Sequence, residues 1–220
     1  MKILAFDTST EYCSIALLLD GELLSREVLA ERRHSELILP MLQRVLEETG
    51  MTLAQLDGIA FGAGPGSFTG LRIACGVAQG LALGVGLPVI GICTLEALAQ
   101  EAGGGDVITV LDARMNEIYH AAYTKAVEGW QPVSEPTLCL PQHAPLVRGC
   151  NWTGCGSGFL MYEEVLRTRY NGCIDHIVSD LRPHARAIAR LAAPRFAKGL
   201  GLDPADAAPL YIRNKVALKE

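Results

Sequence analysis

The feature that most constrains the fold is a short pattern that occurs twice, an apolar strand that ends in aspartate. Ile3-Leu4-Ala5-Phe6-Asp7 is the first copy and Ile108-Thr109-Val110-Leu111-Asp112 is the second. The two aspartates are 112 − 7 = 105 positions apart, about half of the 220 residues. Solenoid repeats have shorter periods, so this spacing indicates duplicated domains. Because each copy leads on to helices, we expect an α/β fold with two related lobes.

The first lobe is expected to cover residues 1–105 in the order βββαβα. Alternating or continuous apolar runs predict its strands, at 2–7, 14–19, 22–29, 58–62 and 89–92. Apolar stripes and caps predict its helices, at 35–49 with Pro40 near the first turn, from a glycine loop to about residue 84, and from Thr94 to Gly103.

The second lobe is expected to cover residues 106–220 as a degenerate copy, with a C-terminal segment free to pack back on the first lobe. Its predicted strands lie at 107–112, 118–123 and 149–154. Four prolines predict a loop with edge-strand fragments over 130–145. We expect a helix from Gly154 to about Tyr170, and a final helix with Pro183 in its first turn and its end near Lys198.

Composition excludes several classes of protein. Half of the residues are apolar, which excludes a disordered chain. The formal charge of 19 − 24 = −5 argues against a general nucleic-acid binder. Seven cysteines without a CxxC pair indicate reduced thiols and a cytoplasmic location. Residues 73–93 are long and apolar enough for a membrane span. Their glycines and Pro88 favour a buried helix, a turn and a strand instead, so no membrane contact is expected.

Asp7-Thr8-Ser9 is the first candidate site. An aspartate at a strand end with hydroxyl residues after it can hold a magnesium–phosphate group. The alternative is a turn in which Asp7 and Ser9 bind their own backbone. Asp112 would supply the matching carboxylate of the second lobe. It is followed by Ala113-Arg114 and no hydroxyl residues, so that half does not carry a phosphate pattern.

Two glycine patterns follow the strand at 58–62. The loop from Gly62 to Gly70 could bind an anion at the helix N-terminus. It lacks the lysine of a Walker A loop and the spacing of a dinucleotide fingerprint. The next helix carries Gly76, Gly80 and Gly84 on one face. Such a ridge indicates close approach of another backbone, either the chain's own sheet or a helix of a partner chain.

No catalytic constellation is visible among the remaining polar residues. The five histidines include no HxxH or HxxxH pair, so a helical two-histidine metal site is not expected. Arg182, Arg186 and Arg190 are spaced at i, i+4 and i+8 on the predicted final helix. They indicate either a solvated face or a contact with a nucleic-acid phosphate backbone.

Four motifs together resemble the bacterial TsaB (YeaZ) family. They are Asp7-Thr8-Ser9, the loop GPGSFTGLR at 64–72, the segment DARMNEIY at 112–119 and PLYIRN at 209–214. The resemblance runs from the first strand to the last ten residues, and the glycine loop is its most specific part. It implies two ribonuclease-H-like lobes of the actin-like, sugar-kinase-like (ASKHA) ATPase fold, in agreement with the duplication.

The resemblance also implies a function. TsaB proteins are non-catalytic partners of TsaD, which acts with the ATPase TsaE to place a threonylcarbamoyl group on the adenosine 3′ of the anticodon. ATP, metal and tRNA are therefore expected in the complex, with no cofactor held by this chain. TsaD contacts the first two long helices of the family. Here the contact candidates are Leu37, Met41, Leu42, Val45, Gly76, Gly80 and Gly84. The isolated chain is a candidate homodimer through the same helices.

An alternative function from another class is an ATP-dependent phosphotransferase of the ASKHA class that uses Asp7. It requires tight Mg-ATP binding that is lost on Asp7→Ala. Direct tRNA binding by the three arginines is a third option, and it requires steeply salt-dependent binding by the isolated chain.

Overall fold

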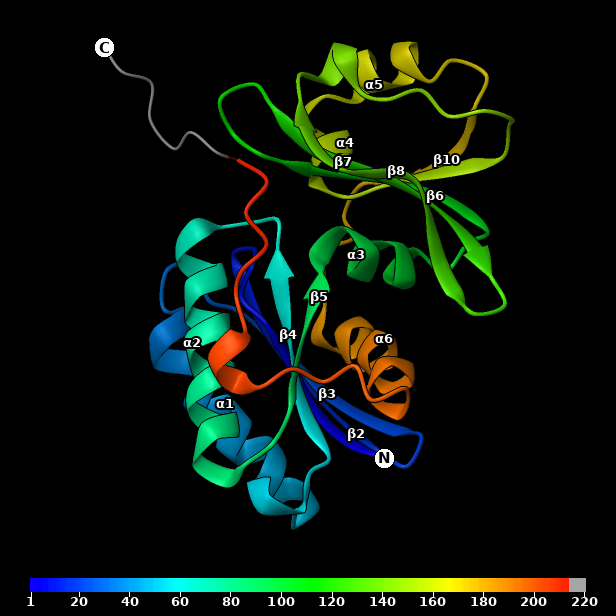
Figure 1. Cartoon of the computed structure of the whole chain (residues 1–220). Helices are drawn as coiled ribbons and strands as arrows, with labels where there is room; N and C mark the ends of the chain where they lie inside the picture. The colour runs from blue at the N-terminus through cyan, green and yellow to red at the C-terminus, as the bar shows by residue number, and fades with distance from the viewer. Residues whose placement is uncertain (214–220) are drawn as a thin grey trace. The chain divides into compact units, whose positions relative to one another are not determined.

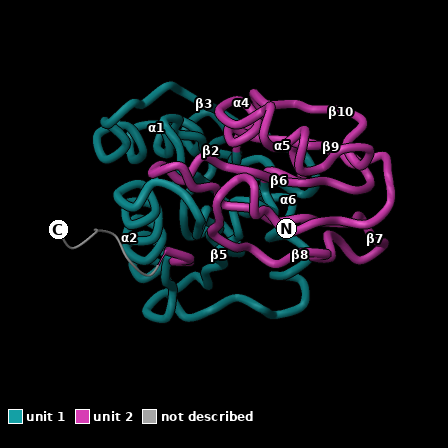
Figure 2. Tube along the Cα trace, turned by 90° about the horizontal axis from the view of Figure 1, so that it is seen from above, with its two compact units in different colours: residues 1–97, 183–209 teal, residues 98–182, 210–220 magenta. Residues whose placement is uncertain are grey.

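The computed structural model describes residues 1–213. Asn214, the last residue of the 209–214 motif, lies outside the described residues. The chain forms two compact units, which Figure 2 distinguishes by colour. Among the described residues, unit 1 contains 1–97 and 183–209, and unit 2 contains 98–182 and 210–213.

Unit 1 is built on a five-stranded mixed sheet (Figure 1), in the order β3-β2-β1-β4-β5. The strands are β1 (Lys2–Asp7), β2 (Tyr12–Leu19), β3 (Glu22–Leu29), β4 (Gly58–Gly64) and β5 (Val89–Cys93). Strand β1 is central, antiparallel to β2 and parallel to β4. The more polar β3 lies at one edge of the sheet, as its sequence predicted. Charged side chains are common on edge strands, which have a strand partner on one side only.

Helices cover both faces of this sheet. Helices α1 (His34–Thr49) and α2 (Phe68–Val85) lie on one face, and α6 (Ala185–Ala197) lies on the other (Figure 1). The short helix α3 (Thr94–Ala102) crosses the boundary between the units, and the 3-10 turns η1 (Leu53–Gln55) and η3 (Pro204–Asp206) complete unit 1. Successive side chains of β1 point to opposite faces of the sheet, so alternate residues of this strand face the two helical layers.

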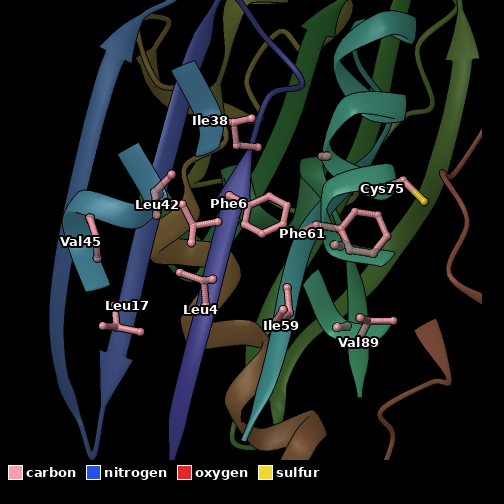
Figure 3. Close-up of a cluster of buried hydrophobic side chains, with 14 of the residues drawn as sticks. Leu4, Phe6, Leu17, Ile38, Leu42, Val45, Ile59, Phe61, Cys75 and Val89 are labelled. Atoms are coloured by element: carbon pink, nitrogen blue, oxygen red, sulfur yellow. The ribbon is translucent and has the colours of Figure 1, made fainter. Parts of the chain in front are cut away.

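The main core of unit 1 lies between the sheet and the α1–α2 layer. Figure 3 shows Phe6 of β1 between Leu42 of α1 and Phe61 of β4, with Ile38 of α1 above it and Leu4 of β1 below it. All five side chains are at most 3% exposed. Burial of a large apolar side chain contributes roughly 1.5–3 kcal/mol. This layer therefore uses most of the apolar stripe that the sequence of α1 displays.

Unit 2 repeats the sheet order of unit 1. Its strands are β6 (Asp106–Asp112), β7 (Ile118–Ala126), β8 (Gly129–Cys139), β9 (Trp152–Cys155) and β10 (Ile174–Val178), in the order β10-β9-β6-β7-β8. Strand β6 is antiparallel to β7 and parallel to β9, as β1 is to β2 and β4. Helices α4 (Ser157–Met161) and α5 (Glu163–Arg169) and the turn η2 (Pro141–His143) complete the unit. The predicted duplication is confirmed.

The expected domain limits need correction. The first unit gives way to the second at residue 97, inside α3 and not after the glycines at 103–105. The second lobe does not extend over all of 106–220, because residues 183–209 belong to unit 1, which fits the expectation of a C-terminal segment that packs back on the first lobe. Helix α6 packs against β1, β2, β4 and β5. It buries the face of the sheet that α1 and α2 leave open, because a sheet face with apolar side chains needs a covering layer.

Several local predictions also differ from the structure. Pro40 lies in the second turn of α1 and not in the first. The expected loop at 130–145 is largely the strand β8, whose prolines are accommodated because it is an edge strand. The helix expected to reach Tyr170 is divided into α4 and α5, and β10 was not predicted. Pro183 precedes the N-cap His184, so it stands just before the last helix.

Candidate functional site

Asp7, Thr8 and Ser9 form a buried turn at the carboxyl end of β1. All three are at most 3% exposed. The Oδ1 atom of Asp7 accepts hydrogen bonds from the backbone N–H of Ser9 at 3.0 Å and from the Ser9 hydroxyl at 2.8 Å. The Thr8 hydroxyl donates to the carbonyl oxygen of Gly70 at 2.7 Å. The groups that could have faced phosphate oxygens are therefore used inside the chain, as in the alternative of a self-satisfied turn.

The second oxygen of Asp7 faces the backbone of β4. Among the described residues, Oδ2 is buried without a hydrogen-bond partner. A Cβ placed on Gly62 would lie 1.9 Å from it and 3.3 Å from Cδ1 of Ile188 on α6. Burial raises the pKa of Asp7 to about 6, the hydrogen bonds from Ser9 act in the opposite direction, and the charge of Glu27 adds to the increase.

A polar row extends from Asp7 across the sheet. Asp7 pairs with Ser14 of β2, and Ser14 pairs with Glu27 of β3. The hydroxyl of Ser14 accepts a hydrogen bond from the backbone N–H of Ala185 at 3.0 Å and so caps α6. Nε2 of His184 lies 3.9 Å from the Glu27 carboxylate. No local sequence pattern indicates this row, because its members come from three strands and the N-terminal end of a distant helix.

The glycine loop packs tightly against the Asp7 turn. A Cβ on Gly70 would lie 1.8 Å from the carbonyl oxygen of Thr8, and one on Gly66 would lie 2.6 Å from that of Ser9. The backbone N–H of Ser67 donates to the Ser9 carbonyl at 2.8 Å. The Ser67 hydroxyl accepts from the N–H of Gly70 and caps α2. These glycines allow two backbones to approach each other, which is a packing role.

Asp112 lies in unit 2 and has different surroundings. Its carboxylate accepts from the backbone N–H of Arg114 at 3.0 Å and forms an ion pair with that guanidinium at 3.1 Å. The Ser157 hydroxyl accepts from its backbone N–H at 3.1 Å. Asp112 therefore ends its strand as Asp7 does, but its partner is a cation of its own turn.

These residues do not fit a magnesium–phosphate group. One Asp7 oxygen is saturated by Ser9, and the other is enclosed by Gly62 and Ile188. No group of three or more metal-ligating side chains occurs among residues 1–213.

The candidate contact residues on α1 divide into buried and half-buried positions. Leu42 and Val45 are at most 3% exposed and belong to the core of unit 1, so they are not surface residues. Leu37 and Met41 are half-buried against the same core. The apolar stripe of α1 mainly covers the chain's own sheet. On this helix the exposed apolar side chain is Leu39.

The glycine ridge of α2 (Gly76, Gly80 and Gly84) lies on the surface. A Cβ on any of the three would meet no atom within 4 Å among the described residues. Close packing on the chain's own sheet is therefore not the reason for these glycines. Leu83 and Val85 near the end of the helix are exposed as well. Helix α2 is long and apolar enough to cross a membrane by length and composition, a test that core helices also pass.

The three arginines do not form one helical stripe. Arg186 and Arg190 are exposed on α6. Arg182 precedes the helix and belongs to unit 2. The expected i, i+4, i+8 surface is thus reduced to two residues one turn apart.

Comparison with known proteins agrees with this architecture. Residues 27–146, more than half of the chain, match the family model described as TsaD, tRNA N6-adenosine threonylcarbamoyltransferase. The chain is 38% identical over its whole length to "tRNA threonylcarbamoyladenosine biosynthesis protein TsaB" of Escherichia coli (strain K12), of which it covers 98%. The protein of the same name from Haemophilus influenzae is 36% identical, with 97% covered.

A solved structure gives the same result. "YeaZ from Pseudomonas aeruginosa" superposes with a TM-score of 0.89 at 37% identity, covering 96% of this chain and 99% of the other. Two α/β units with the same five-stranded order define a protein of the actin-like, sugar-kinase-like ATPase class of fold. Within that class, the chain belongs to the TsaB (YeaZ) family.

Proposed function

We propose that this chain is a non-catalytic subunit of the assembly that makes threonylcarbamoyladenosine in tRNA, and that it binds a TsaD-type subunit through α1 and α2. A role in threonylcarbamoyladenosine biosynthesis follows from its family, whose members carry that name. The observation that carries the finer proposal is the open glycine ridge of α2.

The three glycines of the ridge lower the stability of α2 in the free chain. Each glycine inside a helix costs about 1 kcal/mol relative to alanine. At Gly76, Gly80 and Gly84 the described part of the chain gives no packing in return. A helix backbone of another subunit can approach closely along such a surface. Leu39, Leu83 and Val85 supply exposed apolar side chains on the same two helices.

The TsaD-family match supports the choice of partner. The matched residues, 27–146, include all of α1 and α2. A TsaD-type protein therefore has a related segment, so that two similar helix pairs can form an approximately symmetric four-helix contact. The same symmetry supports a homodimer of the isolated chain through the ridge.

We assign the transfer chemistry, ATP and metal to the TsaD-type and TsaE-type partners. Asp7 supports this assignment, because its carboxylate is bound to Ser9 and enclosed by the chain. Arg186 and Arg190 are candidate tRNA contacts within the complex, and Arg182 is a further candidate on the other unit. The proposal places the complex in the cytoplasm, where its tRNA substrate lies.

Reconstitution of tRNA modification with and without this chain tests the proposal. The TsaD-type and TsaE-type subunits, tRNA, ATP and threonylcarbamoyl-adenylate are mixed, modified adenosine is measured by nucleoside analysis, and ATP hydrolysis is measured for each component. We expect modification only when the chain is present, co-elution of the chain with the TsaD-type subunit, and no ATP hydrolysis by the chain alone. Full modification without the chain, or failure to co-elute, would overturn the proposal.

A further inference from the structure

An unusual backbone segment lies in the turn between β6 and β7. Arg114, Met115 and Asn116 have φ values of +61°, +55° and +60°. None is glycine, and only asparagine adopts this left-handed region readily. In L-residues the region brings Cβ close to the following carbonyl oxygen. Three successive residues persist there only when surrounding contacts determine the conformation.

Local contacts hold part of this turn. The backbone N–H of Arg114 donates to the Asp112 carboxylate at 3.0 Å. The N–H of Ala113 donates to the carbonyl oxygen of Glu117, and the N–H of Glu117 donates to that of Arg114, both at 3.0 Å. These bonds close the turn at its base. They do not involve the carbonyl oxygen of Ala113 or the side chain of Met115.

Arg213, about 100 positions later in the sequence, contacts these two groups. One guanidinium nitrogen donates to the Ala113 carbonyl at 2.9 Å and lies 2.7 Å from the Glu117 carboxylate. The other nitrogen contacts the sulfur of Met115 at 2.9 Å. The Arg213 side chain is only 14% exposed. A planar guanidinium can serve several acceptors at once in a fixed geometry, which a lysine cannot do.

We infer that Arg213 is a clamp that holds the turn at 113–117 in its left-handed conformation and fixes the segment 210–213 to the turn. The clamp links two sequence motifs, 112–119 and 209–214, that the α1–α2 surface does not explain. In this turn the Arg114 side chain is 85% exposed and Met115 is 53% exposed. This inference does not depend on the proposed function.

Hydrogen exchange of the full chain tests the clamp without any partner. In Arg213→Ala, the amides of 113, 114 and 117 are expected to exchange about tenfold faster or more, which corresponds to the loss of one charge-assisted hydrogen bond. The amides of β6 serve as the reference for a folded unit 2 and should keep their protection. Arg213→Lys should give an intermediate effect, because one ammonium nitrogen cannot occupy both the position beside Ala113 and Glu117 and the position beside Met115.

Two further variants separate the backbone effect from the loss of contacts. Met115→Gly and Met115→Ala both remove the sulfur, but only glycine adopts φ +55° without a Cβ penalty. In the Arg213→Ala background, the glycine variant should exchange more slowly at 113–117 than the alanine variant. Wild-type exchange in Arg213→Ala would overturn the inference. Equal exchange in the two Met115 variants would also overturn it, because left-handed backbone would then not be what Arg213 holds.

Discussion

Oδ2 of Asp7 and the α-carbon of Gly62 lie so close that a Cβ on Gly62 would be 1.9 Å from that oxygen. Glycine at position 62 therefore makes room for a buried carboxyl group that the fold positions between β1, β4 and α6. Gly62→Ala should destabilise the protein by about 1–3 kcal/mol, the usual range for overpacking a core. Chemical denaturation measures this loss.

A double-mutant cycle identifies Asp7 as the cause. In the Asp7→Ala background the carboxyl group is absent, so Gly62→Ala should be less harmful, with a coupling of about 1–2 kcal/mol. Additive effects of the two substitutions would show that the Cβ is rejected by Ile188 or by the backbone instead.

The pH dependence of stability should report the buried Asp7. Because its pKa is about 6 in the folded protein and 3.8 ordinarily, the folded state favours the protonated form. This contribution is fully present below pH 3.8 and is lost as the pH rises through 6, a change of about 3 kcal/mol. Asp7→Asn should remove that loss, so the variant gains stability relative to wild type between pH 4 and 7. Unfolding free energies across this range measure the effect, and parallel curves for the two proteins would contradict it.

The same variant distinguishes the two functions considered for the chain. If the chain is a non-catalytic subunit, Asp7→Asn should support reconstituted tRNA modification at the wild-type rate. If Asp7 were the catalytic carboxylate of a phosphotransferase, the substitution would abolish Mg-ATP-dependent activity. Since Asn can keep the Oδ1 acceptor for Ser9, misfolding is not the expected cause of any loss.

His120 should produce the opposite pH dependence in unit 2. Tyr170 donates to the Pro145 carbonyl at 2.9 Å, so Nε2 of His120 donates to the Tyr170 oxygen at 2.8 Å. Burial lowers the pKa of His120 to about 4 from 6.5. Its stabilising contribution is present above pH 6.5 and is lost as the pH falls towards 4, by about 3 kcal/mol. His120→Gln should make the unfolding free energy less dependent on pH between pH 4 and 6.5. An unchanged pH dependence in this range would contradict the role of His120.

Gly80→Leu should have opposite effects on the free chain and on the complex. A Cβ at Gly80 meets nothing within 4 Å, and leucine is the better helix former, so the free chain should gain about 0.5–1 kcal/mol. The bulky side chain should abolish co-elution with the TsaD-type subunit and dissociate any homodimer that uses the ridge. Thermal unfolding and size-exclusion chromatography measure the two effects.

Gly105→Leu is the matched control for the ridge. Gly105 is also open to a Cβ and does not have a left-handed backbone, but it lies before β6 in unit 2. This variant should bind the TsaD-type subunit like wild type. A Gly80→Leu chain that is stable and still binds would place the contact elsewhere.

Much of the fold could be predicted from local sequence because the signals are local. Apolar runs that end in Asp7 and Asp112 specify two central strands, and Gly50 ends α1 in a left-handed cap. Strand β10 escaped prediction because it is short and largely exposed, with Asp175 and His176 inside it. The pattern of β8 was obscured by prolines, which only an edge position tolerates.

The amino-acid sequence by itself determined the duplication, the central strands and the family motifs, since these depend on residues close together in the chain. The tertiary structure decided which surfaces are free. Leu42 and Val45 share a helical stripe with Leu37, but they are buried against the sheet of unit 1, whereas Leu37 is only partly buried. It also decided that α6 covers β1 and that Arg213 meets Glu117, 96 positions earlier. Such pairings depend on the path of the whole chain, and no local pattern of residues encodes them.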